Sequence, residues 1–163
     1  MLAKTHKGTA VVTLPTNTQV MITREFDVPK HLIYKAWTTP TLIRRWWSAN
    51  RGEVTIADVD LRVGGTWRWV MKTSQGFDVA FHGVYREIVP DERLVFTEVF
   101  EGMPGAEAVT TLRFTEHDGH TTLTMLVQHT CQEDRDAHVN SGMEAGMQDA
   151  MDLLELAVVS PSA

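Results

Sequence analysis

The middle of the chain constrains the fold most, because short apolar runs alternate there with pairs of turn-forming residues. Between Glu53 and His129 the sequence gives six strand candidates, separated by Gly64-Gly65, Gln75-Gly76, Pro90-Asp91, Gly102 to Gly105 and Asp118-Gly119. An Asp-Gly pair tolerates the positive φ angles of a two-residue hairpin turn, so the strands beside Asp118-Gly119 should pair antiparallel. The pattern predicts a meander of antiparallel hairpins.

The residues before this meander predict one further strand and two short helices. Residues Val20 to Phe26 alternate apolar and polar side chains, which is typical of a half-buried strand. Pro29 suits the first turn of a helix, and apolar residues at helical spacing follow as far as Trp37. Thr39-Pro40 then separates off a second short helix, from Thr41 to Trp47, with Thr39 as its expected N-cap.

The C-terminal part of the chain changes to a helical period. Apolar residues spaced by three and four predict one long amphipathic helix along Met143, Met147, Ala150, Met151, Leu154 and Val158. Two expected capping boxes, Thr130 to Glu133 and Ser141 to Glu144, indicate a short helical turn before it. The fold class is therefore α+β, with a sheet of hairpins closed over a long C-terminal helix.

Length and composition indicate one folded domain. A chain of 163 residues, 43% hydrophobic and 22% charged, can bury a sizeable core and lies outside the composition of disordered chains. We expect residues 1–17 to form an N-terminal tail or, in the threonine-rich segment from Thr9 to Thr18, an extra edge strand. Residues 18–160 should form the single domain.

Charge and motif content exclude several classes of function. A net charge of -6 argues against nucleic acid as the main partner, and Arg44-Arg45 is interpreted as the solvated face of a short helix. No apolar run approaches a membrane span, and the N-terminus lacks the apolar core of a signal peptide, so we expect a cytoplasmic protein. The single cysteine, Cys131, suits a reducing compartment. The seven histidines show no metal spacing and no phosphate-binding loop occurs, so neither a metal nor another cofactor is expected.

Several stretches of the sequence resemble one known family. They are ITREFDVPKHLIYKAW followed by TLIRRWW, DVDLRVGGTWRW, HGVYREIVPDERLVFT, and TLRF with HDGHTTLTM before the final helix. Together they are similar to the activator of heat-shock protein ATPase homologue-like branch of the START-like, or SRPBCC, superfamily, from about Val20 to Val158. The resemblance implies a helix-grip fold, in which a seven-stranded curved antiparallel sheet wraps around the C-terminal helix and leaves a cavity between them.

Strand parity assigns one face of the sheet to this cavity. On that face we place Leu94, Thr110, Leu123, Met125 and Val127 together with expected ligand contacts, which are Trp67, Trp69, Met71, Phe96, Glu98, Leu112 and Phe114. The remaining expected contacts, Met143, Met147 and Met151, should face them from the C-terminal helix. Aromatic rings and thioethers suit a flexible apolar ligand, although the same stripes also form ordinary cores. The cavity is expected between Trp69, Phe96, Leu112 and the methionine stripe, with Glu98 as its polar contact.

Two polar residues leave alternatives open at this point. Glu98 shares its face with apolar neighbours, so it either pairs with a cation such as Arg24, contacts a ligand, or lies at the rim of the sheet in water. His82 lies on a strand, but Gly83 beside it can introduce a bulge that reverses the direction of the histidine side chain. Neither residue is assigned as catalytic.

Proteins of this fold do not share one function, so the resemblance does not name a reaction. Relatives bind lipids, steroids or plant hormones, cyclise polyketides, or stimulate a chaperone ATPase. The first interpretation is a protein that binds an apolar or amphiphilic small molecule. The alternatives are an enzyme of the cyclase, dehydratase or isomerase type acting in the same cavity, and a co-chaperone-like interaction domain. The expected partner is a hydrophobic small molecule, with a second copy of the chain or a chaperone as alternatives.

Overall fold

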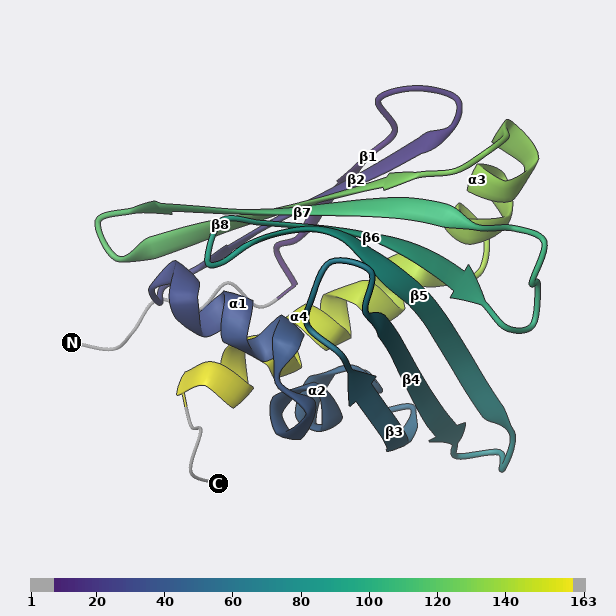
Figure 1. The fold of residues 1–163 in the computed structure, drawn as a ribbon, viewed down its shortest axis with the longest axis horizontal. Coiled ribbons are helices and arrows are strands. Elements are labelled where there is room, and N and C mark those ends of the chain that lie inside the picture. The colour runs from purple at the N-terminus through teal and green to yellow at the C-terminus, as the bar shows by residue number, and fades with distance from the viewer. Residues whose placement is uncertain (1–7, 160–163) are drawn as a thin grey trace.

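A curved antiparallel sheet wraps around a long C-terminal helix in the computed structural model, which describes residues 8–159 (Figure 1). The elements in chain order are β1(Val11–Thr13), β2(Gln19–Phe26), α1(Lys30–Thr38), α2(Pro40–Trp46), β3(Gly52–Val59), β4(Thr66–Thr73), β5(Asp78–Val89), β6(Arg93–Phe100), β7(Ala108–His117), β8(His120–Gln128), α3(Gln132–Val139) and α4(Met143–Val159). The α+β helix-grip fold predicted from the sequence is confirmed.

Within the described residues the sheet has eight strands, in the order β1-β2-β8-β7-β6-β5-β4-β3, and every neighbouring pair is antiparallel. The expected number was seven. The additional strand is β1, which lies in the threonine-rich segment and pairs with β2 at the edge of the sheet. Residues 1–7 of the expected tail and residue 160 of the expected domain lie outside the described residues.

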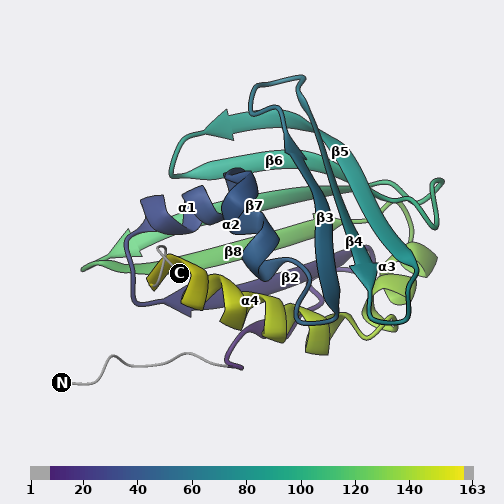
Figure 2. The same cartoon turned by 90° about the horizontal axis from the view of Figure 1, so that it is seen from below.

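The turns between the strands determine their antiparallel pairing. Asp118 and Gly119 have φ angles of 51° and 78°, and the strands beside them pair from His117↔His120 onward, as an Asp-Gly hairpin requires. Helices α1, α2 and α4 lie together on the concave side of the sheet, whereas α3 lies at one end (Figure 2). None of the described helices is long and apolar enough to cross a membrane.

The core lies between the concave face and these helices. Alternate residues of β7, from Ala108 through Leu112 to Phe114, are buried, and the apolar stripe of α4 is buried at Met147, Ala150, Met151, Leu154 and Val158. The side chains at every second position of the strands and those on the apolar stripe of α4 therefore pack together in one apolar layer.

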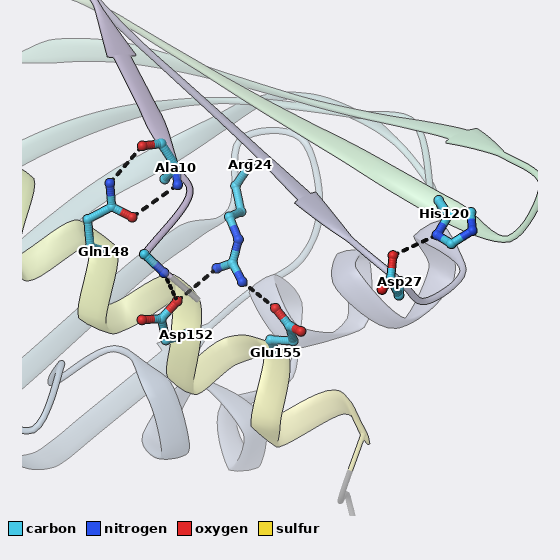
Figure 3. A network of polar contacts seen from close by, with 8 residues as sticks. Ala10, Arg24, Asp27, His120, Gln148, Asp152 and Glu155 are labelled. Atoms are coloured by element: carbon cyan, nitrogen blue, oxygen red, sulfur yellow. Dashed lines mark hydrogen bonds and ion pairs between the residues drawn. The ribbon is translucent and has the colours of Figure 1, made fainter. Parts of the chain in front are cut away.

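Helix α4 is also held to the edge of the sheet by polar contacts (Figure 3). The fully buried guanidinium of Arg24 on β2 forms ion pairs with Glu155 and with Asp152, the latter at 3.3 Å from Nη1 to Oδ1. The side-chain amide of Gln148 bonds the backbone of Ala10 twice, accepting from its N–H at 3.0 Å and donating to its carbonyl at 2.6 Å. These contacts fix the helix relative to β1 and β2.

The helix starts differ from the predicted caps. Thr39 occupies the N-cap position of α2, but its side chain forms no capping hydrogen bond. The N-cap position of α3 is Cys131, one residue after Thr130, so the Thr130 hydroxyl reaches the side chain of Asp134 instead. The Ser141 hydroxyl donates backwards to the carbonyl of His138 at 2.7 Å. Neither predicted capping box forms, because each hydroxyl is out of position for an amide three residues on.

Candidate ligand pocket

All five tryptophans of the chain lie in one aromatic cluster on the concave side of the sheet. Trp37 comes from α1 and contacts Trp46 of α2, with ring centroids 4.7 Å apart. Trp69 of β4 contacts its strand neighbour Trp67 at 5.1 Å and Trp47 at 5.7 Å. The period of two along β4 places Trp67 and Trp69 on one face, and the two short helices bring the other three rings onto it.

A small cavity lies at the edge of this cluster. Its volume is about 10 Å³, and its lining residues are Trp37, Trp67, Trp69, Tyr85, Leu94, Phe96 and Glu98. A space of this size holds about one water molecule. Pockets that enclose drug-sized ligands span about 300 to 1,000 Å³, so this cavity admits a water-sized group without rearrangement.

Glu98 is the charged residue of the lining. Its side chain shares the concave face with Leu94 and Phe96, as strand parity predicts, and the residue is partly buried. Among the described residues it makes no hydrogen bond and no ion pair. Burial raises the pKa of the Glu98 carboxyl to about 7, because desolvation penalises its charged form.

The alternatives that the sequence left open for Glu98 can now be compared. Arg24 does point to the concave side, but its guanidinium pairs with Asp152 and Glu155 on α4. Glu98 is therefore not the partner of Arg24, and it lies, partly buried, beside buried tryptophans. What remains is a carboxyl group that faces an aromatic cavity without a protein partner.

Two hydrogen-bond donors of the lining also lack partners within residues 8–159. The indole Nε1 atoms of Trp37 and Trp69 are buried and have no acceptor. Trp67 differs, since its Nε1 donates to the backbone carbonyl of Thr97 at 3.1 Å. Unsatisfied buried donors are rare and costly, at about 1 to 3 kcal/mol each, so two of them in one lining mark this place as unusual.

Gly83 makes the local geometry possible. It is the β5 partner of Trp67, and a Cβ atom on Gly83 would lie 1.7 Å from the Thr97 carbonyl oxygen and 2.6 Å from Trp67 Nε1. The absence of a side chain lets the indole of Trp67 cross β5 and bond β6 next to Glu98. Thr97 also accepts a hydrogen bond at its hydroxyl from the Val84 amide, at 2.9 Å.

The sequence model of the family described as Activator of Hsp90 ATPase homolog 1-like protein matches residues 27–158. The chain belongs to this family. Membership supports a ligand-binding or co-chaperone-like domain in general, and it names neither a ligand nor a specific role.

Solved structures of similar fold come from several bacteria. A protein of Rhodobacter sphaeroides is 25% identical, with a TM-score of 0.86 over 93% of this chain and 99% of that one. A Nitrosomonas europaea protein is 22% identical, with a TM-score of 0.82 over 91% and 98% of the two chains. An Arthrobacter aurescens protein is 21% identical, with a TM-score of 0.83 over 93% and 92%. These similarities show the fold. Among curated proteins, none matches the sequence.

In this member of the family, the expected ligand contacts fall into two groups. Trp67, Trp69, Phe96 and Glu98 line the cavity. The others do not belong to its lining: Leu112, Phe114, Met147 and Met151 are buried in the core, and Met71 and Met143 are partly buried. The cavity therefore lies between β4, β5, β6 and α1, away from the methionine stripe of α4.

Sequence reasoning did not include Trp37, Tyr85 and Leu94 among the ligand contacts. Leu94 was placed on the correct face, and the parity of β5 was a usable signal for Tyr85. For Trp37 the helical spacing indicated only burial, because its position over the cavity depends on how α1 packs on the sheet.

His82 lies outside the pocket. Its ring is exposed on the opposite face of the sheet, where Nδ1 is 2.9 Å from Glu101 Oε2, and Arg68 bonds the same carboxylate. Hydrogen bonds from Arg68 and His82 hold the pKa of Glu101 at about 2. In residues 8–159 no group of three or more His, Cys, Asp or Glu side chains is arranged to hold a metal ion.

Proposed function

We propose that this protein binds a small, largely apolar molecule between the sheet and helix α1, with Glu98 as the polar contact. The observation that supports the proposal is the unpartnered Glu98 carboxyl beside the aromatic cavity. Burying a polar group without a hydrogen-bond partner is costly, and a leucine in its place would be cheaper to bury. A ligand that bonds the carboxyl would offset this cost.

The size of the cavity sets the manner of binding. Because about 10 Å³ accepts only a water-sized group, a larger ligand must displace side chains of the aromatic cluster. Trp47 and Phe81, which are only partly buried, pack edge-to-face at 5.8 Å beside Trp69. We expect these outer rings to move first, so that the polar group of the ligand reaches Glu98 while its apolar body contacts the tryptophans.

The alternatives have less support from this geometry. A carboxyl with a pKa near 7 suits general acid–base chemistry, but the other titratable side chain of the lining is Tyr85, and burial raises the pKa of its phenol well above the ordinary value. A chaperone-facing surface on β4 and β5 would have to include the charged network of Arg68, His82 and Glu101. Ligand binding uses the observed cavity directly.

Titration with isopropylbenzene tests the proposal. We expect saturable shifts of the indole N–H signals of Trp37, Trp67 and Trp69 in the nitrogen–proton NMR spectrum. Leu94→Phe should abolish these shifts, because a larger ring there fills the cavity. Met147→Phe is the matched control, since Met147 is buried outside the lining and binding should persist. Absence of saturable shifts for wild type, or equal binding by both variants, would contradict the proposal.

A further inference from the structure

Two buried hydrogen-bond donors of the pocket have no acceptor. The indole N–H groups of Trp37 and Trp69 lack acceptors, and the carboxyl of Glu98 becomes a third donor when it carries a proton. None of the seven lining residues is a lysine, arginine or histidine. What the two indoles lack is therefore an acceptor.

We propose that the pocket recognises an uncharged molecule through an acceptor oxygen, such as a ketone carbonyl, which accepts hydrogen bonds from the Glu98 carboxylic acid and from the indole N–H groups of Trp37 and Trp69. This inference rests on the proposed ligand-binding function and names the chemical class of its ligand. A carbonyl oxygen is about the size of a water molecule and fits the observed volume of about 10 Å³.

Charged ligands match the pocket less well. An ammonium group would pair with an ionised Glu98 and lie against ring faces, but it brings only donors and leaves both indoles without an acceptor. A carboxylate ligand would accept from the indoles, yet it would face Glu98 with no cation in the lining to compensate. A neutral acceptor can accept from these donors and brings no charge to oppose Glu98.

The protonation state of Glu98 is consistent with this arrangement. Burial alone raises the pKa of its carboxyl to about 7, with no charged neighbour contributing. Tyr85, the other titratable group of the lining, stays neutral because burial raises the pKa of its phenol further. Near neutral pH the acid form of Glu98 is thus well populated. A ligand that accepts from this form should bind more weakly as the pH rises above 7.

Three ligands of nearly equal shape can distinguish recognition of a neutral acceptor from recognition of an apolar or a cationic group. Acetophenone, isopropylbenzene and 1-phenylethylammonium share a phenyl ring and a branched head, and differ in whether the head is an acceptor, apolar or cationic. At about pH 6 we expect acetophenone to bind about tenfold more tightly than isopropylbenzene. The indole N–H signals of Trp37 and Trp69 should move downfield with the ketone only, and above pH 7 its affinity should fall toward that of isopropylbenzene, by at most about tenfold.

Two variants identify the role of Glu98. Glu98→Gln keeps an N–H donor, so the ketone preference should persist while its pH dependence disappears. Glu98→Leu removes one of the donors, so it should reduce the ketone preference and abolish its pH dependence without abolishing binding of isopropylbenzene. Tightest binding of the ammonium ion with affinity rising with pH, or equal affinity for ketone and hydrocarbon, would overturn the inference and leave the proposed function standing. If none of the three ligands binds, both are wrong.

Discussion

Glu98 shows how one buried side chain couples the stability of the fold to pH. Its carboxyl has a pKa of about 7 in the folded protein, against an ordinary value of 4.5. The folded state therefore retains a proton that the unfolded chain releases as the pH rises from 4.5 toward 7. A state that binds more protons is destabilised relative to the other as protons are removed, so Glu98 lowers the free energy of unfolding across this window.

Glu98→Gln should remove this dependence. Relative to wild type, the variant should gain on the order of 2 to 3 kcal/mol in the free energy of unfolding between about pH 4.5 and about pH 7. Urea unfolding of both proteins at several pH values gives the difference, in which the contributions of other groups, such as Glu101 with its lowered pKa, cancel. Parallel stability curves for the two proteins would show that Glu98 titrates normally.

At the scale of elements, the indole of Trp67 crosses β5 and reaches the backbone of β6. The crossing depends on Gly83, because a Cβ atom there would lie inside the contact radius of the Thr97 carbonyl. The same stretch positions Glu98, the residue after Thr97. Strands β5 and β6 therefore contribute both to the hydrogen bonding of the sheet and to the lining of the pocket.

Gly83→Ala should cost about 1 to 3 kcal/mol in unfolding free energy or more, since the methyl group overpacks a site bounded by backbone. It should also shift the indole N–H signal of Trp67 as its hydrogen bond to Thr97 is lost. Gly105→Ala is the control, because nothing lies within 4 Å of a Cβ atom there and its φ is ordinary. Its effect should stay within about 0.5 kcal/mol, and comparable effects of both substitutions would contradict the close approach.

At the scale of the whole molecule, α4 closes the concave side of the sheet and is held there by an ionic contact as well as by its apolar stripe. Arg24 has a fully buried side chain, while Asp152 and Glu155 are each 17% exposed. Burial lowers the pKa of Arg24, although both carboxylates oppose that effect. Removing the cation would leave two carboxylates close together against the core.

Arg24→Met should therefore cost about 3 to 5 kcal/mol in the free energy of unfolding. Arg62→Met is the matched control, because Arg62 pairs with Asp60 on the surface and its side chain is 71% exposed. An exposed pair of this kind contributes at most about 1 kcal/mol. Urea unfolding of the two variants measures the difference. Equal losses would mean that the apolar stripe alone holds α4.

The architecture was predictable because it follows from local periods. Alternation in β4 and β6 placed Trp67, Trp69 and Glu98 on the cavity side, and helical spacing located the buried stripe of α4. The partners of these residues were not predictable in the same way. Arg24 alternates with Ile22 and Phe26 on the inner face of β2, but its pairing with Asp152 depends on the rotation and depth of α4.

The position and volume of the cavity could not be predicted from the sequence for a related reason. Its volume is the small remainder left after large side chains from α1, β4, β5 and β6 pack together, so shifts of a fraction of an ångström decide it. Composition alone supported the expected location of the cavity, beside the methionine stripe of α4. The structure fills that region with Leu112, Met147 and Met151 and leaves a space beside Glu98.

The gathering of all five tryptophans in one cluster has an optical consequence. Indole rings at centroid distances of 4.7 to 6.1 Å lie well within the range of excitation-energy transfer, so light absorbed by one ring can be emitted by another and the five are not independent sources. Intrinsic fluorescence therefore reports on the corner formed by α1, α2 and β4. Local fraying of β1, α3 or the end of α4 should therefore change the intrinsic fluorescence little.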